Sequence, residues 1–217
     1  KSSAASDVYK RQIQALEGRD YTEFWGIESN PDISTLKKAI ESGKEKNIDF
    51  LLAVGGGSVI DGTKLISAGI PYDGDAWELV KKGSAQNTIP LGTVLTIPAT
   101  GSEMNNGAVI SCRETHEKYP FFSSHPVFSI LDPTVTFSLP DYQIACGLAD
   151  TFVHVMEQYM TKTNESYLMD RWSESILRTL VQIAPQIKEN KQDYHLMSEF
   201  MTVSYTHLRA HETEADL

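Results

Sequence analysis

The 217-residue sequence has little cysteine, a deficit of basic charge and no long apolar run. Its two cysteines, Cys112 and Cys146, are too few for a disulfide framework and suit a reducing compartment. The net charge of -10 argues against a nucleic-acid partner, because such proteins need a basic surface. No stretch approaches the roughly 18 apolar residues of a membrane span, and residues 1–12 lack the apolar core of a signal peptide. We therefore expect a globular cytoplasmic protein with no nucleic-acid or membrane partner.

The two ends of the chain look foreign to the segment between them. Asp7–Gln12 (DVYKRQ) is the translation of one end of a transposase-type adaptor used in sequencing libraries, and Val203–Leu208 (VSYTHL) is the translation of its complementary strand. One DNA element on opposite strands at both ends is hard to obtain by chance. We therefore assign residues 1–12 and 202–217 to adaptor DNA and regard them as not native.

This assignment decides how a tempting pair of histidines is interpreted. His207 and His211 have the spacing of two metal ligands on one face of a helix. Because both fall in the adaptor-derived end, we expect them to have no role. Fold and function are therefore sought in residues 13–201.

Strand-like and helix-like segments alternate in the first part of this region. The expected strands are short apolar runs of the kind that parallel strands buried on both faces show, at Phe50–Val54, Ile89–Ile97 and Val127–Leu131. Residues 32–46 have apolar side chains at helical spacing, and residues 61–68 also indicate a helix. This order predicts an α/β domain with a mostly parallel sheet over residues 13–140.

The pattern changes after Pro140. Residues 141–161 and 167–189 are long helical stretches, and Pro185 is expected to kink or interrupt the second of them. We therefore place a domain boundary near Pro140 and assign residues 141–201 to the beginning of an all-helical domain.

A glycine-rich turn follows the first expected strand, in FLLAVGGGSVID (residues 50–61). Glycines let backbone amides approach an anion closely, and the start of a helix adds partial positive charge. The turn thus suits a pyrophosphate, although it is not the G-x-G-x-x-G pattern. The alternative is an ordinary strand-to-helix turn with Ser58 as the helix N-cap.

Hydroxyl and amide side chains follow the second expected strand, in TIPATGSEMN (residues 96–105). Open α/β sheets bind ligands at the carboxyl ends of their strands, which is where this segment would lie. Taken alone, the segment fits an ordinary polar turn that caps a helix better than it fits a binding loop.

Asp150 and His154 form a D-x3-H pair. On a helix this spacing presents a carboxylate and an imidazole on one face, a pair that suits Fe²⁺ or Zn²⁺. The alternative is a local Asp–His hydrogen bond on a solvated face. Two ligands do not complete a catalytic site, which usually takes three from the protein. The other histidines, His116, His125 and His195, are expected at the surface.

Together these segments resemble the iron-containing alcohol dehydrogenase family, in its branch of NADPH-dependent aldehyde reductases and butanol dehydrogenases. The matching blocks are GIESNP (26–31), FLLAVGGGSVIDGTK (50–64), IPLGTVLTIPATGSEMN (89–105), SILDP (129–133) and GLADTFVHVMEQY (147–159). The resemblance implies a Rossmann-like dinucleotide-binding domain followed by a helical metal-binding domain. It implies hydride transfer between a nicotinamide cofactor and an aldehyde or primary alcohol, and we expect a homodimer in the intact protein.

The resemblance also assigns site residues. Those that would bind the dinucleotide are Gly55, Gly56, Gly57, Ser58, Asp61, Thr96, Thr100, Ser102, Asn105 and Lys118. The family's metal, Fe²⁺ or Zn²⁺ here, is held by one aspartate and three histidines. Asp150 and His154 match the first two and would act in catalysis through the metal; nothing in the sequence matches the other two, so we expect an incomplete and inactive fragment.

Two departures from the family pattern bear on the cofactor. Relatives that prefer NAD often carry an aspartate before the glycine that matches Gly26, where this chain has Trp25. Without that negative charge, NADP(H) is expected rather than NAD(H). Ser29 replaces the family's proline, a change with no interpretation. Two other functions stay open: an enzyme of the dehydroquinate-synthase-like superfamily, and a cofactor-binding remnant without catalysis.

Overall fold

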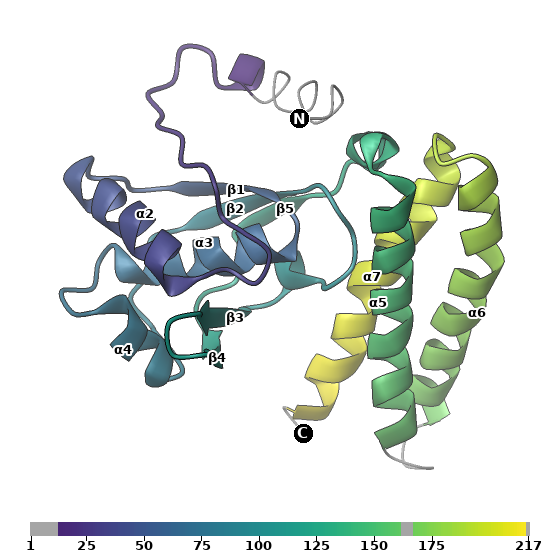
Figure 1. Cartoon of the computed structure of the whole chain (residues 1–217). Helices are drawn as coiled ribbons and strands as arrows, with labels where there is room; N and C mark the ends of the chain where they lie inside the picture. Colours follow the sequence, from purple (N-terminus) through teal and green to yellow (C-terminus); the bar gives the residue numbers. More distant parts are fainter. Residues whose placement is uncertain (1–12, 162–166, 216–217) are drawn as a thin grey trace.

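A three-stranded parallel sheet lies at the centre of the first half of the chain (Figure 1). The computed structural model describes the backbone of residues 13–161 and 167–215. The strands are β1 (Leu51–Gly55), β2 (Leu91–Leu95) and β5 (Phe128–Ile130), in the order β1-β2-β5. All three coincide with the apolar runs expected to be strands, and both pairings are parallel, so the α/β class is confirmed.

Helices pack against one face of this sheet. The two expected helices are α2 (Ile33–Glu45) and α3 (Gly57–Gly69), and α3 lies directly beneath the strands in Figure 1. Ala53 and Thr93, neighbours in the strand register, are both buried on the sheet. A first apolar core lies between α2, α3 and the elements around them, with Leu36 and Leu65 fully buried in it.

The expectation that every strand is buried on both faces is wrong. Only β2 is buried along its whole length, because it lies between the other two strands. On the face opposite the α3 side, Leu52 and Phe128 flank Gly92 in the register and are both exposed. The Phe128 ring lies over Gly92, whose absent side chain leaves room for it, and stacks on Phe50 at 6.1 Å between ring centroids.

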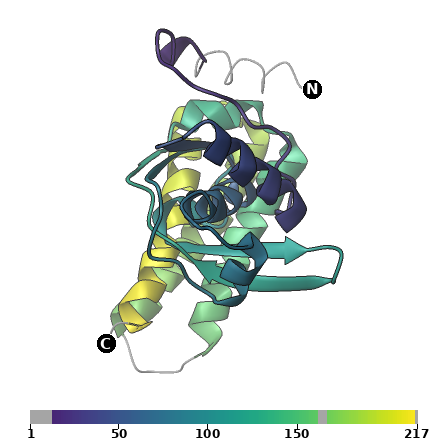
Figure 2. The ribbon, with the colours of Figure 1, turned by 90° about the vertical axis from the view of Figure 1, so that its left-hand side faces the viewer.

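A helix and a hairpin were not expected from the sequence. They are α4 (Ala76–Lys81) and the antiparallel pair β3 (Gly107–Cys112) and β4 (Glu117–Phe122), which reaches out to one side of the molecule in Figure 2. Pro120 obscures β4 because proline is disfavoured within strands.

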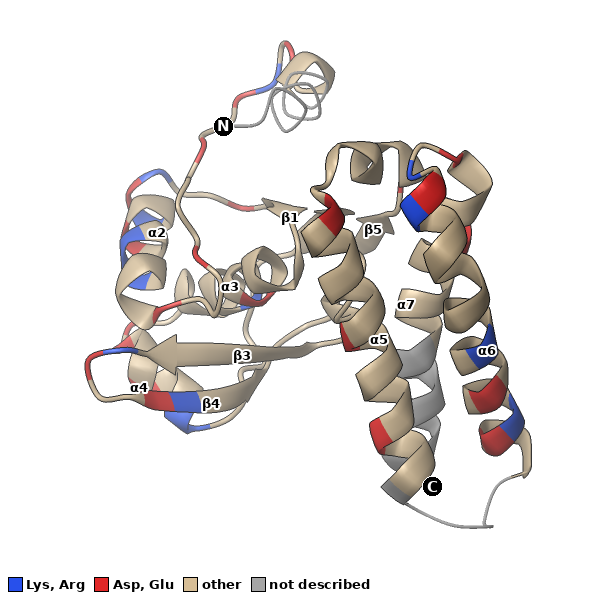
Figure 3. Cartoon of the chain, turned by 45° about the vertical axis from the view of Figure 1, so that its right-hand side comes forward, with Lys and Arg blue, Asp and Glu red and all other residues tan. Residues whose placement is uncertain are grey.

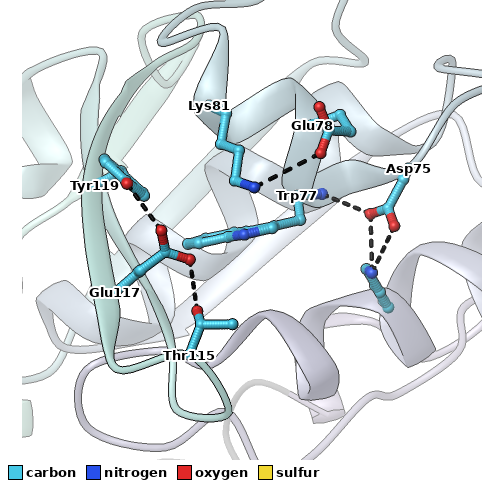
Figure 4. A network of polar contacts seen from close by, with 8 residues as sticks. Asp75, Trp77, Glu78, Lys81, Thr115, Glu117 and Tyr119 are labelled. Atoms are coloured by element: carbon cyan, nitrogen blue, oxygen red, sulfur yellow. Dashed lines mark hydrogen bonds and ion pairs between the residues drawn. The ribbon is translucent and has the colours of Figure 1, made fainter.

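The hairpin is fixed to α4 by an aromatic contact (Figure 4). The rings of Trp77 and Tyr119 lie 5.6 Å apart. Glu117 accepts hydrogen bonds from Thr115 Oγ1 at 2.5 Å and from Tyr119 Oη at 3.0 Å, and these bonds lower the pKa of its carboxyl. The hairpin therefore has its own anchor on the side of α4.

The second half of the described chain is helical. After a 3-10 helix (Pro133–Ser138) come α5 (Asp141–Thr161), α6 (Tyr167–Glu189) and α7 (Tyr194–Ala215), which stand side by side in Figure 1. They share a second apolar core whose largest fully buried side chains are those of Ile187, Met197 and Phe200. The helical character expected after Pro140 is thus found, while the division into two domains stays a prediction.

Pro185 was expected to kink or interrupt α6; the interruption is wrong, because α6 continues past it to Glu189, and the kink stays a prediction. A proline in a helix deprives the carbonyl four residues earlier of its hydrogen-bond donor. Here that residue is Val181, which is 65% exposed, so water can reach this side of the helix. The helix therefore loses one internal bond without leaving a buried carbonyl unpaired.

The end assigned to adaptor DNA is partly packed. α7 runs through residues 202–206, where Val203 and Ser204 are buried. The packing of a helix does not report the origin of its codons, so that assignment stays a prediction. Residues 1–12 lie outside the described residues, as do the side chains of His207 and His211.

Candidate dinucleotide and metal site

The glycine turn lies against the segment that follows β2. A Cβ atom on Gly56 would come 2.3 Å from Ile97 Cγ2, and one on Gly57 would come 2.4 Å from Thr100 Oγ1. The backbone N–H of Thr96 donates to the Gly55 carbonyl at 3.0 Å. Because β1 and β2 are adjacent parallel strands, their carboxyl ends bring together two segments that lie 40 residues apart.

The start of α3 is formed by Gly56 and Gly57. Its N-cap is Gly56, and no side chain caps it. The alternative in which Ser58 caps the helix is therefore not observed. Instead Ser58 Oγ accepts a hydrogen bond from the backbone N–H of Asn30 at 3.2 Å. The backbone amides of the first turn and the helix dipole thus point out of the turn, as anion binding requires.

Asp61 fastens the second segment to α3. Its carboxylate accepts hydrogen bonds from Ser102 Oγ at 2.8 Å and from the Val109 N–H at 3.0 Å. Thr100 Oγ1 in turn donates to Ser102 Oγ at 3.2 Å. Burial raises the pKa of Asp61, against the opposing effect of Lys64 and these hydrogen bonds. Both Asp61 oxygens are thus used in hydrogen bonds within the protein.

Lys118 reaches the same turn from the hairpin. It lies on β4 with its Nζ 2.9 Å from Asn30 Oδ1, and Asn30 is the residue bonded to Ser58. The side chain is exposed, so a cationic group stands beside the start of α3. Sequence reasoning passed over Asn30, although it lies in the GIESNP block and has a left-handed φ of 54°.

Lys64 is the second residue that sequence reasoning missed. It is 0% exposed, and its Nζ donates to the Ser102 carbonyl, Asn105 Oδ1 and the Gly107 carbonyl at 2.7, 2.8 and 2.6 Å. The available signal was its place three residues after Asp61, which puts both side chains on one face of α3. The structure therefore brings all ten residues expected to bind the dinucleotide into two connected turns and the neighbouring hairpin.

The expected metal pair lies on α5. His154 Nε2 is 3.6 Å from Asp150 Oδ1, and the two side chains are 43% and 44% exposed. α5 carries acidic residues but no lysine or arginine, so no cation of its own competes with a bound metal (Figure 3). A carboxylate and an imidazole that converge in this way fit two ligands of Fe²⁺ or Zn²⁺.

α5 also contacts the turn after β2. Thr151 Oγ1 lies 3.4 Å from the Ala99 carbonyl, and Gly147 packs against the Pro98 carbonyl. Asp150 precedes Thr151, so the metal pair lies on a neighbouring face of the helix that touches the second cofactor segment. Among residues 13–161 and 167–206, no group of three or more histidine, cysteine or acidic side chains is placed to hold a metal.

The remaining candidate side chains are peripheral. His116, His125 and His195 are exposed, as expected. Cys112 is buried and Cys146 is exposed on α5; both thiols are free. None of the described helices is long and apolar enough to span a bilayer.

Comparisons with known proteins agree with this geometry. The sequence model of iron-containing alcohol dehydrogenase matches residues 1–133. The NADPH-dependent aldehyde reductase YqhD of Escherichia coli is 45% identical over 200 residues, which cover 89% of this chain and 52% of YqhD. The probable NADH-dependent butanol dehydrogenase 1 of Bacillus subtilis is 47% identical over 206 residues, 93% of this chain and 52% of that protein.

Solved structures give the same result. The crystal structure of E. coli YqhD superposes with a TM-score of 0.88 at 44% identity, covering 94% of this chain and 54% of that one. NADH-dependent butanol dehydrogenase A of Thermotoga maritima gives 0.88 at 33% identity, covering 93% and 52%. The chain therefore spans about half the length of these relatives, and it belongs to the iron-containing alcohol dehydrogenase family.

Proposed function

We propose that this chain is the cofactor-binding half, with the first two metal ligands, of an oxidoreductase that transfers hydride between NADP(H) and an aldehyde or primary alcohol. The observation that carries the proposal is the pairing of the glycine turn with the Thr96–Asn105 segment, which the helix that bears Asp150 and His154 contacts at Pro98 and Ala99. A dinucleotide site and a metal pair then share one end of the sheet, which is where open α/β sheets bind ligands.

The residues of the chain would divide the work as follows. The backbone amides of Gly56, Gly57 and Ser58 bind the pyrophosphate, and Lys118 neutralises phosphate or contacts the ribose. Asp61 holds Ser102, and through it Thr100, in place along the cofactor. Asp150 and His154 hold Fe²⁺ or Zn²⁺, which when bound supplies a Lewis acid for the substrate oxygen.

NADP(H) is proposed over NAD(H) on the charge next to Gly26. Trp25 occupies that position, is 67% exposed and carries no negative charge to repel a 2'-phosphate. The Glu23 carboxylate accepts a hydrogen bond from the indole Nε1 at 2.8 Å. Named relatives include both NADPH-dependent and NADH-dependent enzymes, so the preference has to be measured on this chain.

Binding and turnover are separate parts of the proposal. The described residues offer two metal ligands where a catalytic site usually takes at least three. We therefore propose that the chain binds NADPH but does not reduce aldehydes alone, and that the intact protein is a cytoplasmic homodimer. The family match favours alcohol dehydrogenase chemistry over the dehydroquinate-synthase-like alternative.

The test is titration of the chain with NADPH, followed by cofactor fluorescence, and with Zn²⁺, followed by calorimetry. We expect saturable NADPH binding that Lys118→Met weakens, and Zn²⁺ binding that His154→Ala removes. Lys188→Met, at an exposed position of α6, is the control. Absence of NADPH binding in the folded chain contradicts the cofactor proposal, and Zn²⁺ binding unchanged in His154→Ala contradicts the metal assignment.

A further inference from the structure

A fully buried lysine connects the two segments of the proposed dinucleotide site. Lys64 lies on α3, whose first turn carries the glycines, and all three protons of its ammonium reach acceptors in residues 102–107. Those acceptors belong to the other segment of the proposed site, which follows β2. We propose that Lys64 is a positioning residue for the dinucleotide, whose ammonium fixes the Ser102–Gly107 turn to α3 before the cofactor arrives.

The hydrogen-bond count supports this role. An ammonium has three donors and no acceptor, and here each donor has one partner. Asn105 Oδ1 also accepts from the Gly107 N–H at 3.0 Å, so the amide is held from two sides. With the two bonds to Asp61, α3 makes five hydrogen bonds to residues 102–109. A turn held this way needs little ordering when a ligand binds, which favours affinity.

Few charged groups lie around Lys64. Asp61 of the same helix and Glu103 of the 3-10 helix Ser102–Met104 both act on the ammonium, and Lys118 acts on Asp61. Glu103 is 2% exposed, and neither of its carboxylate oxygens has a hydrogen-bond partner. Burial raises the pKa of Glu103, as it does that of Asp61, because burial disfavours a charged carboxylate. The cluster therefore places one buried cation beside two acids whose charged forms are disfavoured.

This setting makes the positioning sensitive to pH. Burial lowers the pKa of Lys64 to about 8, despite the opposing effect of Asp61 and Glu103. A neutral amine has only two protons for three acceptors, so one acceptor in the turn loses its donor above that pH. If only the charged form holds the turn, the NADPH dissociation constant rises about tenfold between pH 7 and pH 9.

The experiment measures NADPH affinity by fluorescence from pH 7 to 9.5, where phosphate groups with a second pKa of about 6 stay ionised. The inference rests on the proposed cofactor site, so wild-type binding at pH 7 is measured first; no binding there overturns both. For the wild-type chain we expect affinity to fall through pH 8. Binding that stays constant across this range overturns the role of Lys64 alone.

Variants assign the titration to one residue. Lys64→Arg keeps its charge throughout this range and is expected to abolish the step at pH 8, whereas Lys37→Met, on the surface of α2, is expected to keep it. Lys118→Met is expected to bind more weakly at every pH with the step retained. A step that disappears in Lys118→Met overturns the inference, and that comparison decides even if the Lys64 variants fail to fold.

Discussion

The carbonyl oxygen of Pro98 lies 2.6 Å from the point where a Cβ atom on Gly147 would stand. α5 therefore rests on the backbone of the turn after β2, with no room for a side chain between them. One turn further along the helix, Thr151 Oγ1 donates to the Gly147 carbonyl at 2.9 Å and lies 3.4 Å from the neighbouring Ala99 carbonyl. This contact sets how closely α5, which carries Asp150 and His154, approaches the turn after β2.

Gly147→Ala should destabilise the protein by about 1–3 kcal/mol, because a backbone carbonyl cannot move aside as a side chain can. Urea unfolding followed by circular dichroism measures the effect. Gly43→Ala in α2 is the matched control, since its new Cβ meets only the flexible end of Ile70 and gains helix propensity. Equal stability changes in the two variants would contradict the close contact.

Gly57→Ala should lower the free energy of unfolding by about 1 kcal/mol or more, because its Cβ would stand 2.4 Å from Thr100 Oγ1. Thr100→Ala removes the atom in the way, so the double variant should recover most of the loss. A double-mutant cycle on unfolding free energies tests this. If the changes in unfolding free energy of the two single variants simply add in the double variant, the close contact between Gly57 and Thr100 is contradicted.

Asp32→Ala should lower the unfolding free energy by about 1–2 kcal/mol at pH 7. Asp32 is the N-cap of α2, and its other oxygen accepts from the Arg113 N–H at 2.8 Å, which joins α2 to the hairpin. Burial raises the pKa of Asp32, but hydrogen bonds from Ser34 and Arg113 outweigh it and the net pKa is lowered.

The pH dependence of that variant follows from the sign of the shift. A carboxyl with a lowered pKa stabilises the fold above its unfolded pKa, and this stabilisation is lost as pH falls through the folded value. The difference between wild type and Asp32→Ala should therefore shrink toward pH 3. A gap that stays constant down to pH 3 would mean that the carboxylate charge contributes nothing.

Trp25→Asp should weaken NADPH binding about tenfold or more and leave NADH binding nearly unchanged, because a carboxylate here would repel the 2'-phosphate. Trp25→Asn, which adds no charge, is the control. Fluorescence titration with both cofactors measures the ratio of the NADPH and NADH dissociation constants. If Asp and Asn shift it equally, the charge at this position does not select the cofactor.

Local patterns along the chain were enough for much of the fold. The runs around Ala53, Val94 and Ser129 predict three strands, because apolar segments this short, bounded by turn residues, are typical of buried strands. The helices after Asp32 and after Pro140 follow from apolar spacing in the same way. α4 and the hairpin were missed, since their stability comes from the Trp77–Tyr119 contact between segments more than 40 residues apart.

The same distinction between local pattern and tertiary packing applies to the candidate site. The amino-acid sequence alone determined which residue types are present: three glycines between a strand and a helix, and an acid and an imidazole one helical turn apart. Only the tertiary structure decided that Lys64 is buried and bonded to the Ser102–Gly107 turn, and that α5 rests on Pro98. The reason is physical: periodicity reports the face of an element that avoids water, while the partner of a buried polar group depends on how distant segments pack.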